Sequence, residues 1–187
     1  MILVVDMNYK KASLGFFEFV LPIVSIAEEL DEVAVKHYTE IKREDIDKSS
    51  IIILSGTALK DHATLNHTDK FEWAGTCEKP LLGICAGMQT LGLVFGLSLK
   101  KCLGIGMTQV NTLKPNLLFS SNFKAYALNS LSVASSSGFE VLAESEQCIQ
   151  AVKHRQRDVY GVLFHPEVRN KEIIQRFLHA FGHDRRV

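Results

Sequence analysis

The sequence has no excess of charge of either sign and no apolar run long enough to cross a bilayer. Its 187 residues contain 21 Lys and Arg against 21 Asp and Glu, so the formal net charge at pH 7 is zero. A balanced charge offers no basic face, so we expect no nucleic acid and no membrane among the partners. The apolar stretch Phe16 to Ile26 is too short for a bilayer span and is interrupted by Glu18 and Pro22.

Cysteine is scarce and lacks the spacing of a metal or redox motif. The four cysteines are Cys77, Cys85, Cys102 and Cys148. They contain no Cys-x-x-Cys pair, and none lies near a histidine at structural zinc spacing. His179 and His183 lie four residues apart, but two ligands rarely hold a metal. We therefore expect reduced cysteines, no metal and no cofactor.

The N-terminus has no signal peptide pattern. Met1 to Asp6 has the apolar composition of a strand, with no basic region before it. We therefore expect a cytoplasmic protein. The length and the 47% hydrophobic composition suit one domain over residues 1–187 with a substantial core.

The most informative segment surrounds Cys85. An apolar strand, Leu81 to Ile84, breaks at small residues and runs directly into an apolar helix from Ala86 to Leu97. A tight strand-to-helix turn of this kind is a nucleophile elbow, in which small neighbours let one side chain stand clear of the sheet. The thiol would face the N-terminus of the helix, whose dipole favours the thiolate. Cys85 is therefore a candidate nucleophile.

The second half of the chain offers a base for this nucleophile. The predicted strand Val159 to Phe164 leads into His165, and Pro166 keeps His165 out of helical geometry. In an extended chain, side chains two positions apart point the same way, so Glu167 can engage the imidazole and orient it. The three residues Cys85, His165 and Glu167 thus form a candidate catalytic triad.

The order of elements predicts an α/β fold. Strands at 1–6, 32–37, 51–54 and 81–84 alternate with helices at 16–30, 65–76 and 86–97. This order favours a doubly wound, mostly parallel sheet, whose ligands bind beyond the carboxyl ends of the strands. Short strands at 105–113, 123–128, 139–143 and 149–153 predict an antiparallel flank. A final strand at 159–164 and a helix at 171–181 complete the chain.

Two motifs resemble the signatures of class I glutamine amidotransferases, a flavodoxin-like fold family. They are Gly83-Ile84-Cys85-Ala86-Gly87-Met88-Gln89 and His165-Pro166-Glu167. The resemblance implies hydrolysis of glutamine to glutamate and ammonia through a thioester on Cys85. It also implies an oxyanion hole formed by the amides of Thr57 and Ala86, and glutamine binding by Gly56, Gln89 and the backbone around Ser130 and Leu131.

Within the family, the order and spacing of residue types from Gly138 to Val168 resemble those of the stand-alone amidotransferase subunits of archaeal-type GMP synthases. Two segments depart from that pattern. Ser55-Gly56-Thr57-Ala58 stands where the family has Ser-Gly-Gly-Pro, and a β-branched Thr57 resists the backbone angles available to glycine. Asn129-Ser130-Leu131 looks more like the glutamine-binding segment of anthranilate and aminodeoxychorismate synthase subunits.

The chain has no phosphate-binding glycine loop and no room for an ATP-using domain. The resemblance therefore implies a separate synthetase subunit of the ATP-pyrophosphatase type that receives the ammonia, with GMP synthesis as the first expectation. Other interpretations are an amidotransferase for another synthetase, a cysteine hydrolase acting alone on γ-glutamyl bonds, and a non-catalytic regulatory subunit. Thr57 favours the last interpretation, whereas the intact triad opposes it.

Overall fold

The computed structural model describes residues 1–135 and 137–182, so His183 lies outside the described residues. The strands are β1 (Ile2–Asp6), β2 (Val33–His37), β3 (Ile51–Leu54), β4 (Leu81–Ile84), β5 (Leu99–Thr112), β6 (Phe123–Val133), β7 (Phe139–Glu144), β8 (Ile149–His154) and β9 (Val159–Val162). The α-helices are α1 (Leu21–Ala27), α2 (Arg43–Lys48), α3 (Glu72–Thr76), α4 (Ala86–Val94) and α5 (Glu172–Phe181).

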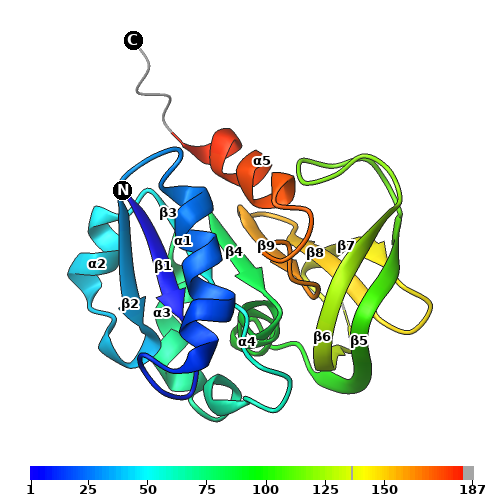
Figure 1. Ribbon diagram of the computed structural model, residues 1–187, viewed down its shortest axis with the longest axis horizontal. Helices are drawn as coiled ribbons and strands as arrows, with labels where there is room; N and C mark the ends of the chain where they lie inside the picture. The colour runs from blue at the N-terminus through cyan, green and yellow to red at the C-terminus, as the bar shows by residue number, and fades with distance from the viewer. Residues whose placement is uncertain (136, 183–187) are drawn as a thin grey trace.

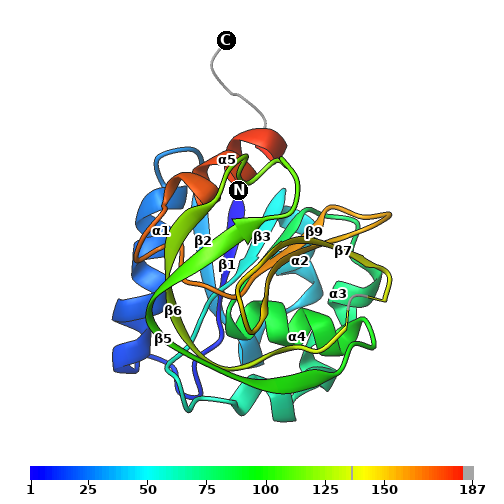
Figure 2. The same cartoon turned by 90° about the vertical axis from the view of Figure 1, so that its right-hand side faces the viewer.

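In the described part of the chain the strands join in the order β2-β1-β3-β4-β9-β8-β7-β5-β6. The first five are mutually parallel, and the last four add in antiparallel pairs. This is the predicted mostly parallel sheet with an antiparallel flank. Figure 1 shows β5 and β6 as a long ribbon to one side of the helices, and Figure 2 shows how strongly this ribbon is twisted.

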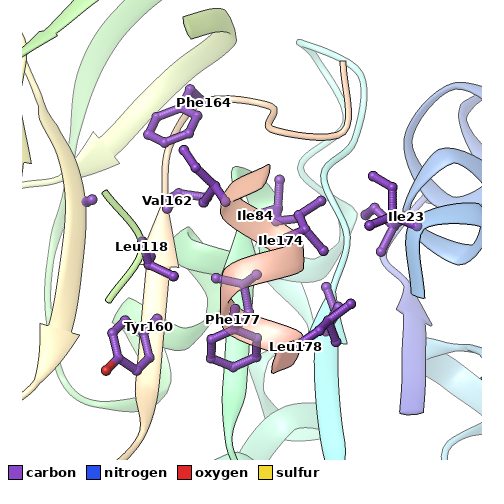
Figure 3. Close-up of a cluster of buried hydrophobic side chains, with 14 of the residues drawn as sticks. Ile23, Ile84, Leu118, Tyr160, Val162, Phe164, Ile174, Phe177 and Leu178 are labelled. Carbon is purple, nitrogen blue, oxygen red and sulfur yellow. The ribbon is translucent and has the colours of Figure 1, made fainter. Parts of the chain in front are cut away.

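The parallel strands β1, β3, β4 and β9 are buried on both faces because helices cover each side, whereas the edge strand β2 is only partly buried. In β1, Ile2 and Val4 pack into one apolar cluster with α1 and α5, while Leu3 and Val5 pack into a second cluster with α2, α3 and α4. Figure 3 shows the first cluster, in which Ile174 and Phe177 of α5 lie among side chains of the sheet and of α1. The core therefore fixes β4 and β9, the two strands that lead to the candidate triad.

Three local features differ from the sequence-based expectation. The expected helix at 16–30 is a π-helical turn (Phe16–Val20) followed by α1, and Pro22 sits in the first turn of α1, where its missing N–H is tolerated. Two 3₁₀ turns (Ala63–Asn66 and Thr68–Phe71) occupy half of the helix expected at 65–76, and only Glu72–Thr76 is α-helical. The short helix α2 is highly charged, and the apolar pattern gives no indication of it.

The cysteines differ from the fully reduced set that we expected. Cys102 of β5 and Cys148, which precedes β8, form a disulfide, with their Cα atoms 6.3 Å apart. Both residues are buried, and Cys77 and Cys85 remain free. The pair is 46 residues apart in sequence, so spacing carried no sign of it. The fold brings the pair together by placing the first part of β5 against the turn between β7 and β8, which contains Cys148.

Across the described residues, no helix has both the length and the hydrophobicity required to cross a membrane.

Candidate active site

The backbone at Cys85 has the conformation of a nucleophile elbow. Cys85 lies between β4 and α4 with φ +47° and ψ −100°, an unusual conformation for a residue other than glycine. Its N–H donates to the Val162 carbonyl at 2.8 Å, which ties the turn to β9. The residues around it must be small: a Cβ on Gly83 would lie 2.6 Å from the Gly87 carbonyl carbon, and one on Gly87 would lie 2.5 Å from the Leu54 oxygen.

The side chains of His165 and Glu167 form a buried pair. Nδ1 of His165 lies 2.7 Å from Oε1 of Glu167, and both side chains are fully buried. The backbone N–H of His165 donates to the Tyr126 carbonyl on β6 at 2.9 Å. This hydrogen bond holds the loop after β9 against the antiparallel flank. The contact predicted between the side chains of His165 and Glu167, which flank Pro166, is therefore present.

Three segments distant in sequence converge at this point. A Cβ on Gly56 would lie 2.5 Å from Cε1 of His165 and 3.6 Å from Cβ of Cys85, so the glycine is required for the close approach. The thiol of Cys85 lies 3.6 Å from the Leu128 carbonyl on β6. Gly56, Cys85 and His165 follow β3, β4 and β9 respectively, at the carboxyl edge of the sheet. This is where ligands of such sheets bind.

The surroundings of His165 favour the protonated form of its imidazole. Burial lowers the pKa of His165, but the negative charge of a Cys85 thiolate and the Glu167 carboxylate outweigh it, so the pKa stands well above the ordinary value of 6.5. The free Nε2 of His165 has no hydrogen-bond partner among the described residues, which leaves it available to Cys85 or to a substrate. An imidazolium in this position can donate a proton to a leaving group.

The residues expected to bind glutamine also lie together. Nε2 of Gln89, on α4, donates to the Leu131 carbonyl of β6 at 2.9 Å. Ser130, the neighbour of Leu131, is half-buried, and its Oγ lies 2.9 Å from Nε2 of His62. The structure thus joins Gln89 of α4 to Leu131 of β6, the strand that also carries Ser130 and whose Leu128 carbonyl contacts the Cys85 thiol.

The two expected oxyanion donors are the backbone N–H groups of Ala86, which follows Cys85, and of Thr57, in the loop after β3. Ala86 is the first residue of α4, where backbone N–H groups have no acceptor within the helix. Thr57 is buried and follows Gly56 directly. The described non-glycine residues with positive φ are Ala12, Cys85 and Asn170. Thr57 is therefore not in the left-handed region, and its loop rests without that strain.

Several residues around the triad gave no signal in the sequence. The ring of Phe19 packs against His165 with centroids 5.1 Å apart, and the ring of Tyr126 lies 6.4 Å from it. His62 contacts Ser130 across 68 residues of sequence. Apolar periodicity finds aromatic residues of the core without saying which of them enclose a histidine. A contact such as His62 with Ser130 depends on the loop conformation alone.

In the described part of the chain, no group of three or more His, Cys, Asp or Glu side chains could hold a metal ion. The arrangement suits acyl transfer. It comprises a cysteine on a strand-to-helix turn, an oriented histidine and free backbone donors at a helix N-terminus. The site thus has the features of a cysteine-dependent enzyme that cleaves amides through a thioester.

Comparison with known proteins places the chain more narrowly. Residues 19–184 match the family model of glutamine amidotransferase class-I. The chain belongs to the class I glutamine amidotransferase family. This is the family that the motifs around Cys85 and His165 resemble, and the predicted fold class is confirmed with it.

Two archaeal relatives are named as subunits of the glutamine-hydrolyzing GMP synthase. The one from Methanosphaera stadtmanae is 38% identical over 109 residues, covering 52% of this chain and 59% of the relative. The one from Methanocaldococcus jannaschii is 36% identical over 115 residues, covering 56% and 61%. The chain therefore spans about 60% of the length of these relatives in the aligned regions.

Solved structures show the same fold. A Thermoplasma acidophilum protein, provisionally named as one of the GMP synthase subunits, superposes with a TM-score of 0.81 at 22% identity, covering 96% of this chain and 92% of that one. The glutaminase domain of Trypanosoma brucei CTPS gives a TM-score of 0.75 at 14% identity, covering 100% and 95%. At these identities the likeness is one of fold.

Proposed function

We propose that this chain hydrolyses glutamine to glutamate and ammonia through a thioester on Cys85. The observation that carries the proposal is the buried His165–Glu167 pair, 2.7 Å apart, packed against Gly56 at the point where Gly56 also approaches Cys85. Membership of the amidotransferase family and the names of the archaeal relatives support glutamine as the substrate.

In the first half-reaction the Cys85 thiolate attacks the carbon of the glutamine side-chain amide. The N–H groups of Thr57 and Ala86 receive the negative charge that develops on the carbonyl oxygen. The His165 imidazolium gives its proton to the departing nitrogen, and the C–N bond breaks to leave a glutamyl thioester and ammonia. Glu167 transfers no proton and stabilises the imidazolium while fixing its orientation.

In the second half-reaction the neutral His165 takes a proton from water, and the resulting hydroxide attacks the thioester carbon. The C–S bond then breaks, so glutamate leaves and the Cys85 thiolate pairs again with the His165 imidazolium. Gln89 and the backbone of Ser130 and Leu131 hold the amino-acid end of the substrate throughout both steps.

We further propose that the ammonia passes to a separate synthetase chain, and that this chain is the nucleotide-activating component of GMP synthase. The archaeal relatives named as GMP synthase subunits support this assignment. The Asn129-Ser130-Leu131 segment keeps a synthetase of the anthranilate or aminodeoxychorismate type as the second candidate. The proposal includes a cytoplasmic location and no nucleic-acid partner.

The test compares glutamate release by the wild-type chain, Cys85→Ala and Cys77→Ala. Cys77 is the matched control because it is the other free, buried cysteine and lies away from the triad at the end of α3. We expect Cys85→Ala to abolish turnover and Cys77→Ala to retain it. Turnover by purified Cys85→Ala would exclude the thioester mechanism.

The partner is tested by adding the nucleotide-activating chain of GMP synthase with its nucleotide and acceptor loaded. Slow basal hydrolysis that rises in the complex indicates coupling between the two sites. Full activity of the isolated chain, unchanged by either candidate synthetase, would favour a hydrolase that acts alone on γ-glutamyl bonds. Absence of hydrolysis in every combination would favour a regulatory role.

A further inference from the structure

The loop after β3 is joined to β6 by a hydrogen bond between the side chains of His62 and Ser130, called the link below. Nε2 of His62 lies 2.9 Å from Oγ of Ser130, and the same Oγ donates to the Leu59 carbonyl at 3.4 Å. A hydroxyl has one hydrogen and two lone pairs. With that hydrogen directed at Leu59, the oxygen can accept from the Nε2–H of His62, so one hydroxyl satisfies both contacts.

The same loop carries Thr57, and its internal hydrogen bonds connect Thr57 to the link. The Thr57 hydroxyl donates to the Asp61 carbonyl at 3.1 Å. The Asp61 carboxylate accepts from the N–H of Tyr9 at 2.7 Å and from the N–H of Ala63 at 3.2 Å. The segment from Thr57 to His62 is therefore held to the loop after β1 at one point and to β6 at another.

The link lies on the side of the site where glutamine is expected. His62 lines a surface cavity together with Ser130, Leu131 and Lys101. The Leu131 carbonyl accepts from Gln89, the side chain placed one helical turn beyond Cys85. A displacement of His62 would therefore change the position of the Thr57 loop relative to the strand expected to hold the substrate.

We propose that His62 is a positioning residue for glutamine hydrolysis, acting through the Ser130 hydroxyl. It holds the loop that contains the Thr57 amide at a fixed position relative to β6. The oxyanion donor and the bound substrate are then correctly placed relative to each other. This inference rests on the proposed function. The effect on catalysis is expected in kcat, because the oxyanion donor acts in the transition state, whereas the backbone of Ser130 and Leu131 still binds the ground state.

The test is a double-mutant cycle on glutamine hydrolysis with His62→Ala, Ser130→Ala and the double variant. Ser130→Ala removes the hydroxyl and leaves the backbone. One oxyanion donor is worth on the order of a hundredfold or more in kcat, and partial misplacement is expected to cost about tenfold. We expect each single variant to lose about tenfold in kcat with KM changed by less than about twofold, and the double variant to lose no more.

Two further variants separate positioning from general destabilisation. His62→Gln can restore a hydrogen bond to Ser130 and is expected to recover most of the kcat. His67→Ala is the matched control, since His67 lies in the same connection but is exposed and its ring approaches Tyr38 instead. Three results would each overturn the proposal. The kcat of His62→Ala could stay within about twofold of wild type, or the losses of the two single variants could multiply in the double variant. The third is a rise in KM at constant kcat.

Hydrogen exchange of the amides of residues 56–61 tests the link without reference to catalysis. Faster exchange in His62→Ala and Ser130→Ala, with wild-type exchange in His67→Ala, supports the link even if no glutamine is hydrolysed, in which case the proposed function alone has failed. Unchanged exchange in both link variants overturns the positioning role even in an active glutaminase.

Discussion

The side-chain amide of Gln89 donates to the backbone carbonyl of Leu131 at 2.9 Å. Gln89 and β6, which are both expected to bind the substrate glutamine, are therefore hydrogen-bonded to each other. The hydrogen bond connects α4, which begins directly after Cys85, to β6, whose Leu128 carbonyl lies 3.6 Å from the thiol. Helix, nucleophile and strand therefore form one unit, in which Gln89 orients the substrate-binding backbone and can also contact the substrate.

This relation predicts a binding defect for Gln89→Ala. The variant removes the bond to Leu131 and the proposed contact to glutamine, both present before and during the reaction, so KM is expected to rise about tenfold while kcat changes little. Steady-state glutaminase kinetics measure this directly. Gln175→Ala is the control, since Gln175 lies on the far helix α5 and makes a surface hydrogen bond to Glu29, which follows α1. Loss of kcat at unchanged KM would contradict the assignment.

The second prediction concerns protonation of His165. Its pKa is raised by the Cys85 thiolate and the Glu167 carboxylate against the opposing effect of burial. Removing the thiolate in Cys85→Ala is therefore expected to lower the pKa of His165, and so is Glu167→Gln. Imidazole chemical shifts followed through a pH titration report both values. A pKa for His165 that is the same in Cys85→Ala and wild type would exclude the ion pair.

The same shift links stability to pH. A pKa raised on folding stabilises the native state fully below the unfolded value of about 6.5, and this stabilisation is lost as the pH rises through the higher folded value. The free energy of unfolding is therefore expected to fall over this range in the wild type. The fall attributable to His165 is expected to be smaller in Cys85→Ala, as denaturant titrations at several pH values can show.

The third prediction tests the Thr57 loop. The link through His62 and Ser130 sets where the Thr57 loop lies, whereas the direction of the Thr57 amide within that loop depends on its own backbone angles. If pointing this amide at the oxyanion requires a backbone state that a β-branched side chain resists, at a cost on the order of 1–3 kcal/mol, then Thr57→Gly is expected to raise basal turnover of the isolated chain. It also shrinks the activation by the synthetase. Thr57→Ser keeps a Cβ and the hydroxyl that bonds Asp61, and is expected to remain close to wild type. Unchanged basal turnover in Thr57→Gly means that the loop is already productive at rest.

The disulfide yields the fourth prediction. Peptide mapping of the chain without reductant is expected to find Cys102 joined to Cys148, with Cys77 and Cys85 as the two reactive thiols after denaturation. In the chain-entropy model a closed loop of this size stabilises the fold by about 4 kcal/mol. Reduction is expected to lower the free energy of unfolding accordingly. Four reactive thiols in the freshly purified, unreduced chain would contradict this pairing.

The sequence predicts the parallel half of the fold well because the signals that end its strands are local. Strand β4 ends at the small residues around Cys85, and β9 ends before His165-Pro166-Glu167, so chain chemistry alone places these groups at strand ends. The pairing of His165 with Glu167 follows from extended geometry over two residues. Predictions of this kind need no knowledge of which strands become neighbours.

The remaining features depend on long-range pairing. Strand β5 begins at Leu99, six residues before the predicted start, because β6 supplies a partner for its backbone groups. The disulfide between Cys102 and Cys148 and the contact between His62 and Ser130 depend on the path of the antiparallel flank and of one loop. Neither hydrophobic periodicity nor turn chemistry contains that information.

The central claim is that Cys85 forms a thioester with the glutamyl group of the substrate. Its most direct test is to mix the chain with glutamine, alone and with the candidate synthetase, quench the reaction in acid within a turnover, and map the modified peptide by mass spectrometry. We expect a glutamyl group on the peptide that contains Cys85 and none on the peptide that contains Cys77. Glutamine hydrolysis with no modification of Cys85 at any quench time, or persistence of hydrolysis in Cys85→Ala, would contradict the claim.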